Sequence, residues 1–271
     1  MNENGKLVIL VTGASGGIGQ SVAEYLAQQG YIVYGTSRKS QVPGSNFQWI
    51  RLDVTNRQDV EDVIDSIIAQ EGKLDVLINN AGIGMISSLE EAPSANVKQV
   101  METNFGGVLH LTQAVLPHMR KRRSGKIINI SSIAGLIGLP YRSIYSASKF
   151  AVEGLTEAVR AEVQKFNIQV CTVQPGSIRT DIKSNRVSYI PEDSYYQPEI
   201  SIAEDIIDTE VGSGIEAEDV AIHIGRLILK THLQSKYVVA KPFQKLGTSL
   251  KRYLPHTIFE KLLMNRYRSK S

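Results

Sequence analysis

Short apolar runs alternate along the chain with longer segments in which apolar residues recur at helical spacing. Most runs are apolar throughout, which is typical of strands buried on both faces of a parallel sheet. They cover residues 7–11, 32–35, 48–52, 74–78, 126–131, 169–173 and 237–239. Helices are predicted at 17–29, 57–70, 94–122, 143–166, 216–231 and 255–268. This order predicts an α/β fold, a doubly wound parallel Rossmann-type sheet of about seven strands with helices on both faces.

The length of 271 residues suits one domain with a single core. Within it we expect a nucleotide-binding half at about 7–125 and a catalytic half at about 126–240. The segment 183–214 breaks the rhythm with prolines, tyrosines and acidic residues, so an irregular substrate lid is predicted there. A basic helix at 255–268 is expected to end the domain.

Composition narrows the class of protein. With 42% hydrophobic and 21% charged residues, the chain has the balance of a globular protein. Its single cysteine, Cys171, cannot form a disulfide within the chain, and the histidines show no metal-ligand spacing, so no metal site is expected. No apolar run approaches the length of a membrane span. A cytoplasmic protein is predicted, with peripheral attachment to a membrane surface left open.

The net charge of +3 is unevenly distributed. Residues 1–220 hold 19 Lys or Arg against 26 Asp or Glu, whereas residues 221–271 hold 11 against one. The basic tail includes an apolar row at Ile258, Phe259, Leu262 and Leu263. It suits either an anionic membrane surface or packing on its own domain against the acidic lid, and we favour the second. The charge is local and has no aromatic interleaving, so no nucleic-acid partner is expected.

A glycine-rich turn follows the first predicted strand. Gly13, Gly17 and Gly19, with Ser15 and Ile18 between them, lead directly into an amphipathic helix. Glycines let the backbone approach a pyrophosphate closely, and the helix N-terminus offers unpaired N–H groups to its oxygens. The turn therefore predicts a dinucleotide site.

The end of the second strand favours NADP(H) over NAD(H). Ser37 and Arg38 occupy the place where a carboxylate would bind the ribose hydroxyls of NAD. An arginine pairs instead with a 2′-phosphate, and a serine hydroxyl can bond it.

Further landmarks accompany the turn. Asn79-Asn80-Ala81-Gly82 follows the fourth strand, Ser132 the fifth, and Pro175-Gly176 the sixth, while Tyr145-x-x-x-Lys149 lies on a predicted helix. With the glycines, this set resembles the short-chain dehydrogenase/reductase superfamily. The likeness is to its standard-length members, nearest to hydroxysteroid, retinol and acyl-lipid reductases.

The resemblance implies further cofactor contacts. Asp53 and Val54 would meet the adenine ring, and Asn80, Ala81 and Gly82 would line the adenosine side. Ile178 and Thr180 would contact the nicotinamide carboxamide or the phosphates. The cofactor set expected on all these grounds is Gly13, Ser15, Gly17, Ile18, Gly19, Ser37, Arg38, Asp53, Val54, Asn80, Ala81, Gly82, Tyr145, Lys149, Pro175, Gly176, Ile178 and Thr180.

Four residues are expected to carry catalysis. Hydride transfer to a carbonyl develops negative charge on its oxygen, which calls for a proton donor and a hydrogen-bond partner. Tyr145 is the predicted donor, because Lys149 one helical turn away would stabilise its anion. Ser132 would hold the substrate oxygen, and the resemblance implies that Asn104 helps carry protons to Lys149 through water.

The predicted function is hydride transfer between NADP(H) and a hydrophobic ketone, aldehyde or alcohol of steroid, retinoid or acyl-lipid type. The almost wholly apolar stretch 133–141 suits such a substrate. Two alternatives remain, a non-catalytic NAD(P)-binding regulatory module and an NAD-linked dehydrogenase of a small polar alcohol. By resemblance, pairing of the helices at 94–122 and 143–166 would give a homodimer or homotetramer, with a monomer also open.

Overall fold

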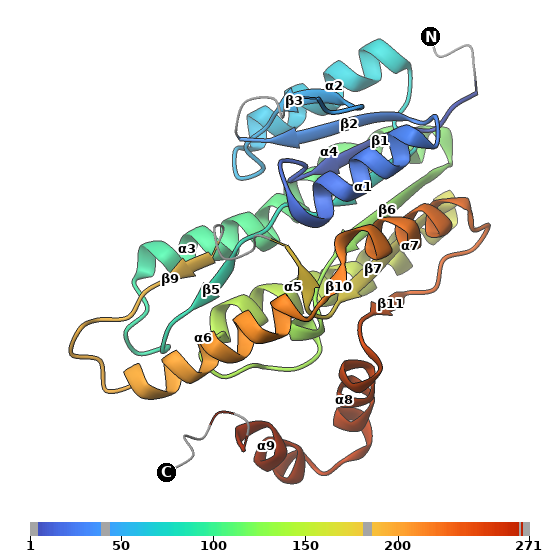
Figure 1. Ribbon diagram of the computed structural model, residues 1–271. Coiled ribbons are helices and arrows are strands. Elements are labelled where there is room, and N and C mark those ends of the chain that lie inside the picture. Colours follow the sequence, from blue (N-terminus) through green and yellow to red (C-terminus); the bar gives the residue numbers. More distant parts are fainter. Residues whose placement is uncertain (1–4, 39–43, 181–185, 266, 268–271) are drawn as a thin grey trace.

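A computed structural model describes residues 5–38, 44–180, 186–265 and 267. Seven strands form one parallel sheet in the order β11-β7-β6-β4-β1-β2-β3 (Figure 1). The predicted doubly wound architecture is confirmed. The strands are β1 (Val8–Thr12), β2 (Ile32–Ser37), β3 (Gln48–Arg51), β4 (Val76–Asn79), β6 (Gly125–Ile130), β7 (Ile168–Pro175) and β11 (Lys236–Val239).

Helices cover both faces of this sheet (Figure 1). The helices of the described residues are α1 (Gly17–Gln28), α2 (Arg57–Glu71), α3 (Ser94–Met101), α4 (Gly107–Arg122), α5 (Ser143–Val163), α6 (Gln197–Gly212), α7 (Ala217–Leu229), α8 (Pro242–Tyr253) and α9 (His256–Met264), of which the last two lie apart from the sheet. Side chains alternate along β1, so Ile9 and Val11 pack with α1 and α7, whereas Val8 and Leu10 pack with α2, α4 and α5. Both faces are therefore buried, as the continuous apolar runs predicted.

The helix predicted at 94–122 is interrupted. Between α3 and α4 the backbone forms a π-helical turn, Glu102–Gly106, in which Asn104 is completely buried. Asn104 forms two hydrogen bonds with the backbone of Ile83, accepting from its N–H and donating to its carbonyl. These contacts come from a distant segment, so helical periodicity alone could not reveal the turn.

The prediction of an irregular segment at 183–214 is wrong for most of its length. Helix α6 occupies its second half and buries Ile200, Ala203 and Ile207 at helical spacing. A short strand, β9 (Arg186–Ser188), pairs in parallel with β5 (Gly84–Ile86). Two further short strands, β8 (Ile178–Arg179) and β10 (Ile215–Glu216), pair beside the sheet. Residues 183–185 of the predicted lid lie outside the described residues.

The chain ends in two helices rather than one. Helix α8 was not predicted, and α9 is shorter than the expected helix at 255–268, of which residues 266 and 268 lie outside the described residues. Both lie at one end of the molecule, apart from the helices that cover the sheet (Figure 1). Leu263 and the buried Tyr267 pack in one cluster with α6 residues. This region therefore docks on its own domain in part, as favoured from the sequence. None of the helices in the described part of the chain is long and apolar enough to span a membrane.

Candidate active site

The turn between β1 and α1 depends on glycine. Gly13 and Gly17 have positive φ angles of 68° and 54°, and residues that carry a side chain rarely adopt such backbone angles. A Cβ atom at Gly19 would lie 2.2 Å from the carbonyl oxygen of Gly13, so the helix could not start this close to the strand with any other residue. The space above the turn and the exposed N-terminus of α1 fit the pyrophosphate of a dinucleotide.

Asn80 braces the same turn from the neighbouring strand. Its side-chain amide donates to the carbonyl oxygens of Thr12 and Gly13 at 2.9 and 3.2 Å. The hydroxyl of Thr12 accepts from the backbone N–H groups of Asn80 and Ala81, both at 3.0 Å. The carboxyl ends of β1 and β4 are thus locked together beneath the turn.

One cavity of about 790 Å³ gathers most of the predicted site residues. Its volume lies in the range of small-molecule sites. It is lined by Gly13, Ser15, Gly17, Ile18, Ser37, Arg38, Asp53, Val54, Asn80, Ala81, Gly82, Ser132, Tyr145, Lys149, Pro175, Gly176, Ile178 and Thr180. The two predicted residues outside this lining are Gly19, which packs beneath the turn, and the buried Asn104.

The adenosine of a dinucleotide is expected at one end of the cavity, where β2 and β3 finish. Arg38 is exposed there and has no carboxylate partner among the described residues, while Ser37 ends β2. Asp53 accepts hydrogen bonds from the N–H and the hydroxyl of Thr55 at 3.0 and 2.8 Å. Its carboxylate is therefore engaged with its own loop, and Arg38 is the charged group free to meet a ligand.

The same cavity also holds the predicted acid and its neighbours. Tyr145 and Lys149 are both buried on the cavity-facing side of α5. Two cations flank the Tyr145 ring, with Arg142 Cζ at 5.0 Å and Lys149 Nζ at 5.9 Å from its centroid. The Lys149 ammonium also donates to the carbonyl of Ile130 at 3.0 Å, which orients it. Both cations therefore lie close to the ring that carries the predicted proton donor.

Ser132 follows β6 and lines the cavity, and its Oγ accepts from the backbone N–H of Ala134 at 3.1 Å. That bond leaves the hydroxyl hydrogen available to a substrate oxygen. Neighbouring side chains of a strand point to opposite faces, yet Ser131 beside Ser132 also contributes to the cavity lining. The Ser131 hydroxyl is nevertheless buried and has no partner among the described residues.

Asn104 contacts the site from behind. Its amide donates to Ser148 Oγ at 3.0 Å, and that hydroxyl donates to the carbonyl of Tyr145 at 2.7 Å. A Cβ built on Gly82 would lie 3.2 Å from Asn104 Oδ1 and 3.5 Å from Lys149 Nζ. The π-helical turn therefore brings Asn104 to the same glycine as Lys149 and, through Ser148, links it to the backbone of α5.

A family model described as short chain dehydrogenase matches residues 7–189. The chain belongs to the short-chain dehydrogenase family. The match covers all the predicted cofactor and catalytic residues, and leaves α6 to α9 outside it.

Individual short-chain dehydrogenases match over nearly the whole chain. A 3-ketodihydrosphingosine reductase from Bacteroides thetaiotaomicron is 42% identical over 93% of this chain and 95% of its own length. A short-chain dehydrogenase from Streptomyces avermitilis has a solved structure with a TM-score of 0.83 at 30% identity, covering 98% of this chain and 99% of that one. The structure of ElxO with NADP bound aligns with a TM-score of 0.72 at 30% identity, over 86% and 97% of the two chains.

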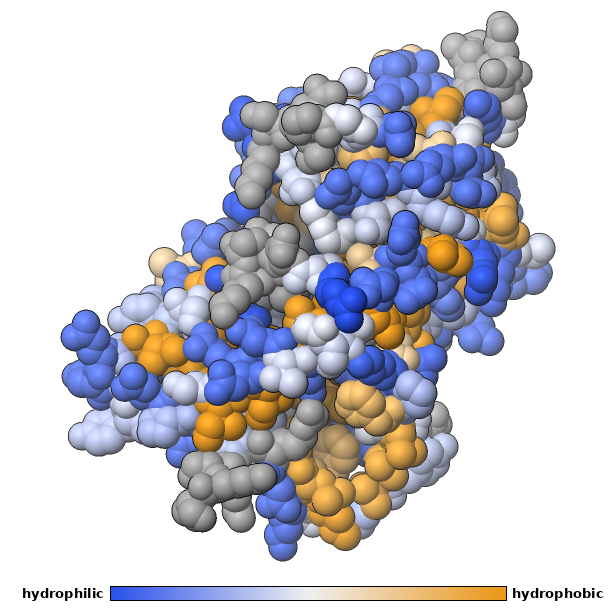
Figure 2. Space-filling model, in the orientation of Figure 1, coloured by the Kyte–Doolittle hydropathy of each residue, from blue (hydrophilic) through white to orange (hydrophobic). Residues whose placement is uncertain are grey.

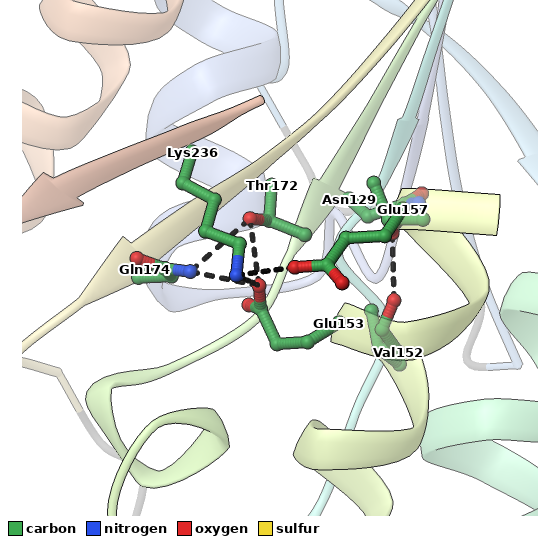
Figure 3. Close-up of polar contacts among 8 residues, drawn as sticks. Asn129, Val152, Glu153, Glu157, Thr172, Gln174 and Lys236 are labelled. Atoms are coloured by element: carbon green, nitrogen blue, oxygen red, sulfur yellow. Dashed lines mark hydrogen bonds and ion pairs between the residues drawn. The ribbon is translucent and has the colours of Figure 1, made fainter. Parts of the chain in front are cut away.

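In this short-chain dehydrogenase, a partly buried polar network holds α5 against the sheet (Figure 3). Glu153, one turn beyond Lys149, accepts from Gln174 Nε2 at 2.8 Å and Thr172 Oγ1 at 3.1 Å on β7. Lys236 of β11 lies 4.0 Å from the same carboxylate and also pairs with Glu157. Because buried polar groups without partners are costly, this network fixes the position of α5 and hence of Tyr145.

The outer wall of the cavity consists of residues that sequence analysis did not assign to the site. They come from α6, α8 and α9 and are mostly apolar: Ile206, Ile207, Val211, Phe243, Leu250, Phe259, Leu262 and Leu263. Gln244 anchors α8 by donating to Ser177 Oγ at 2.8 Å, and the Lys251 ammonium donates to the carbonyl of Leu136. Burial lowers the pKa of Lys251. The helical spacing of apolar residues in α8 was the sequence signal that could have revealed this part of the wall.

Proposed function

We propose that this short-chain dehydrogenase transfers a hydride between NADP(H) and a hydrophobic ketone or aldehyde, or the corresponding alcohol. The observation that carries the proposal is the two-ended cavity. Tyr145, Lys149 and Ser132 lie at one end beside the glycine-rich turn, and apolar side chains of α6, α8 and α9 line the other. An apolar wall suits a lipid-like substrate of the steroid, retinoid or acyl-lipid kind.

The residues at the inner end would manage the proton. A bound nicotinamide supplies or accepts the hydride at the substrate carbon. Tyr145 gives its phenolic proton to the developing alkoxide in reduction and takes it back in oxidation, while Ser132 donates a hydrogen bond to the same oxygen. Lys149 stabilises the phenolate, and Asn104, which the Ile83 backbone holds in place, would help to carry protons to Lys149 through water.

The preference for NADP(H) rests on Arg38. It is exposed at the adenosine end with no described carboxylate partner, and the β2 end carries no acidic side chain to repel a 2′-phosphate. The NADP-bound structure of ElxO, at 30% identity, supports the same choice.

A long-chain lipid ketone is the substrate that we favour, of the kind for which the 3-ketodihydrosphingosine reductase of Bacteroides thetaiotaomicron is named. Ile206, Ile207 and Val211 of α6 would cover its chain as a lid. The described wall is long and apolar, as an acyl chain requires.

The test is NADPH oxidation with 3-ketodihydrosphingosine, comparing the wild type with Tyr145→Phe. We expect turnover to fall on the order of a thousandfold while NADPH binding, followed by its fluorescence, is unchanged. Tyr195→Phe is the matched control, because this side chain is 95% exposed and outside the cavity. Preserved turnover in Tyr145→Phe would show that Tyr145 is not the proton donor and would contradict the proposed mechanism. NADPH binding by a wild type that reduces no lipophilic carbonyl would favour a non-catalytic module.

A further inference from the structure

Helix α8 presents an apolar stripe to solvent. Phe243, Leu246, Leu250 and Tyr253 follow one another at intervals of three or four residues, which places them on one side of the helix. All four are exposed, from 37% for Leu250 to 78% for Tyr253. A soluble surface does not normally collect large apolar side chains in this way.

Helix α9 extends the same surface. Ile258 and Leu262 are one turn apart and are 48% and 54% exposed, and Met264 is 41% exposed. Figure 2 shows this hydrophobic surface gathered over the α8 and α9 region, around a hollow. We call these seven residues of α8 and α9 the apolar rim.

The hollow belongs to the cavity already described. Three members of the apolar rim, Phe243, Leu250 and Leu262, also line that cavity. The others, Leu246, Tyr253, Ile258 and Met264, do not. Through Phe243, Leu250 and Leu262 the apolar wall of the site continues onto the exposed surface of α8 and α9.

The part of the sequence that carries the rim is positively charged. Residues 241–271 contain eight Lys or Arg and a single acidic residue, Glu260. Lys245 and Lys261 are exposed on the two helices. A second copy of this chain would bring two such basic surfaces together, which is unfavourable, whereas a surface of anionic lipid complements them.

We infer that the apolar rim docks on an anionic lipid bilayer, and that the lipophilic substrate passes from the bilayer into the cavity between α8 and α9. In this inference the identity of the substrate rests on the proposed function. The docking on a membrane rests on the exposed apolar and basic side chains of α8 and α9. Apolar side chains enter the acyl boundary while lysines contact the headgroups, as in interfacial helices.

Flotation with lipid vesicles tests the docking step. Wild-type protein should bind vesicles of phosphatidylcholine and phosphatidylglycerol in equal amounts about tenfold more tightly than vesicles of phosphatidylcholine alone. The variant Leu246→Gln/Ile258→Gln/Met264→Gln alters the rim outside the cavity and should bind the mixed vesicles on the order of a hundredfold more weakly. The matched control, Leu89→Gln/Tyr195→Gln/Leu229→Gln, changes residues that are 64%, 95% and 69% exposed elsewhere and should bind like the wild type.

The outcomes separate the docking from the chemistry. Equal NADPH binding by both triple variants shows that each is folded. Failure of the wild type to float, equal losses in both variants, or dimerisation through the rim seen by light scattering would overturn the docking. With 3-ketodihydrosphingosine as the probe, the rim variant should lose about tenfold in rate on vesicle-embedded substrate and none on detergent-dispersed substrate. Equal rates in vesicles would overturn entry from the bilayer. Absence of any turnover by wild type would count against the proposed function, while flotation would still decide the docking.

Discussion

The two ends of the cavity are built by different means. At the cofactor end, backbone geometry and the ends of parallel strands place the groups, and glycines approach other backbone atoms too closely for a side chain. At the outer end, apolar side chains of α6, α8 and α9 form the wall, and several are half exposed. We therefore expect the two ends to respond to different changes, the cofactor end to crowding of the backbone and the outer end to the size of its apolar side chains.

The largest effect should come from crowding the cofactor end. Gly19→Ala places a Cβ 2.2 Å from the Gly13 carbonyl oxygen, so the turn must shift. We expect a loss of about 3 kcal/mol, or on the order of a hundredfold, in NADPH affinity. Gly16→Ala is the control, because its Cβ would meet nothing within 4 Å. Similar NADPH titration curves for the two variants would show that backbone crowding at the glycine turn does not determine NADPH affinity.

The next effect concerns the network behind the catalytic helix. Glu153→Ala leaves the buried Thr172 hydroxyl without its acceptor and removes one of the two acceptors of Gln174 Nε2, and should cost about 2 kcal/mol of unfolding free energy in urea denaturation. Glu157→Ala removes an exposed carboxylate and should cost under about 1 kcal/mol. Comparable losses of unfolding free energy in the two variants would mean that the buried hydrogen bonds of Glu153 stabilise the protein no more than the exposed ion pair of Glu157 does.

The charge at the adenosine end can be tested in the same protein. Arg38→Ala should weaken NADPH binding about tenfold by removing a partner of the 2′-phosphate, and leave NADH binding within about twofold. Parallel fluorescence titrations at constant ionic strength measure both. An equal change in affinity for NADPH and NADH would show that Arg38 contacts a group that both nucleotides share.

The smallest effect should come from the outer wall. Phe259→Ala shortens a side chain that lines the cavity far from the turn, and should raise KM for a long-chain ketone about fivefold. KM for NADPH should not change. If the KM values for the ketone and for NADPH rise together, the two ends of the cavity are coupled, and the distinction between them is wrong.

The sheet and the turn were predictable because their signals are local. Predicted strands begin and end within two residues of the observed ones, since apolar runs and glycines report directly on burial and on tight turns. The helix at 197–212 was missed because acidic residues and prolines hid the spacing of Ile200, Ala203 and Ile207. Helix α8 was missed although Phe243, Leu246 and Leu250 already carry a helical period.

The site was predictable to the extent that single motifs mark it. The glycine turn and Tyr145 with Lys149 come together in one cavity, as expected from their places at strand ends and on one helix face. Asn104 was expected within reach of Lys149, but the π-helical turn that carries it depends on contacts with Ile83. The outer wall follows from packing between separate helices, which no local pattern records.

The π-helical turn at Glu102–Gly106 has a consequence for the register of this part of the chain. A π turn holds one residue more than the α-helical path it replaces, so a deletion there would restore a continuous helix. That helix would be rotated by about a quarter of a turn on one side of the deletion. Leu111 and Val115 of α4 would then leave the core or Asn104 would leave Ile83. Segment length between α3 and α4 is thus as constrained as any side chain in the site.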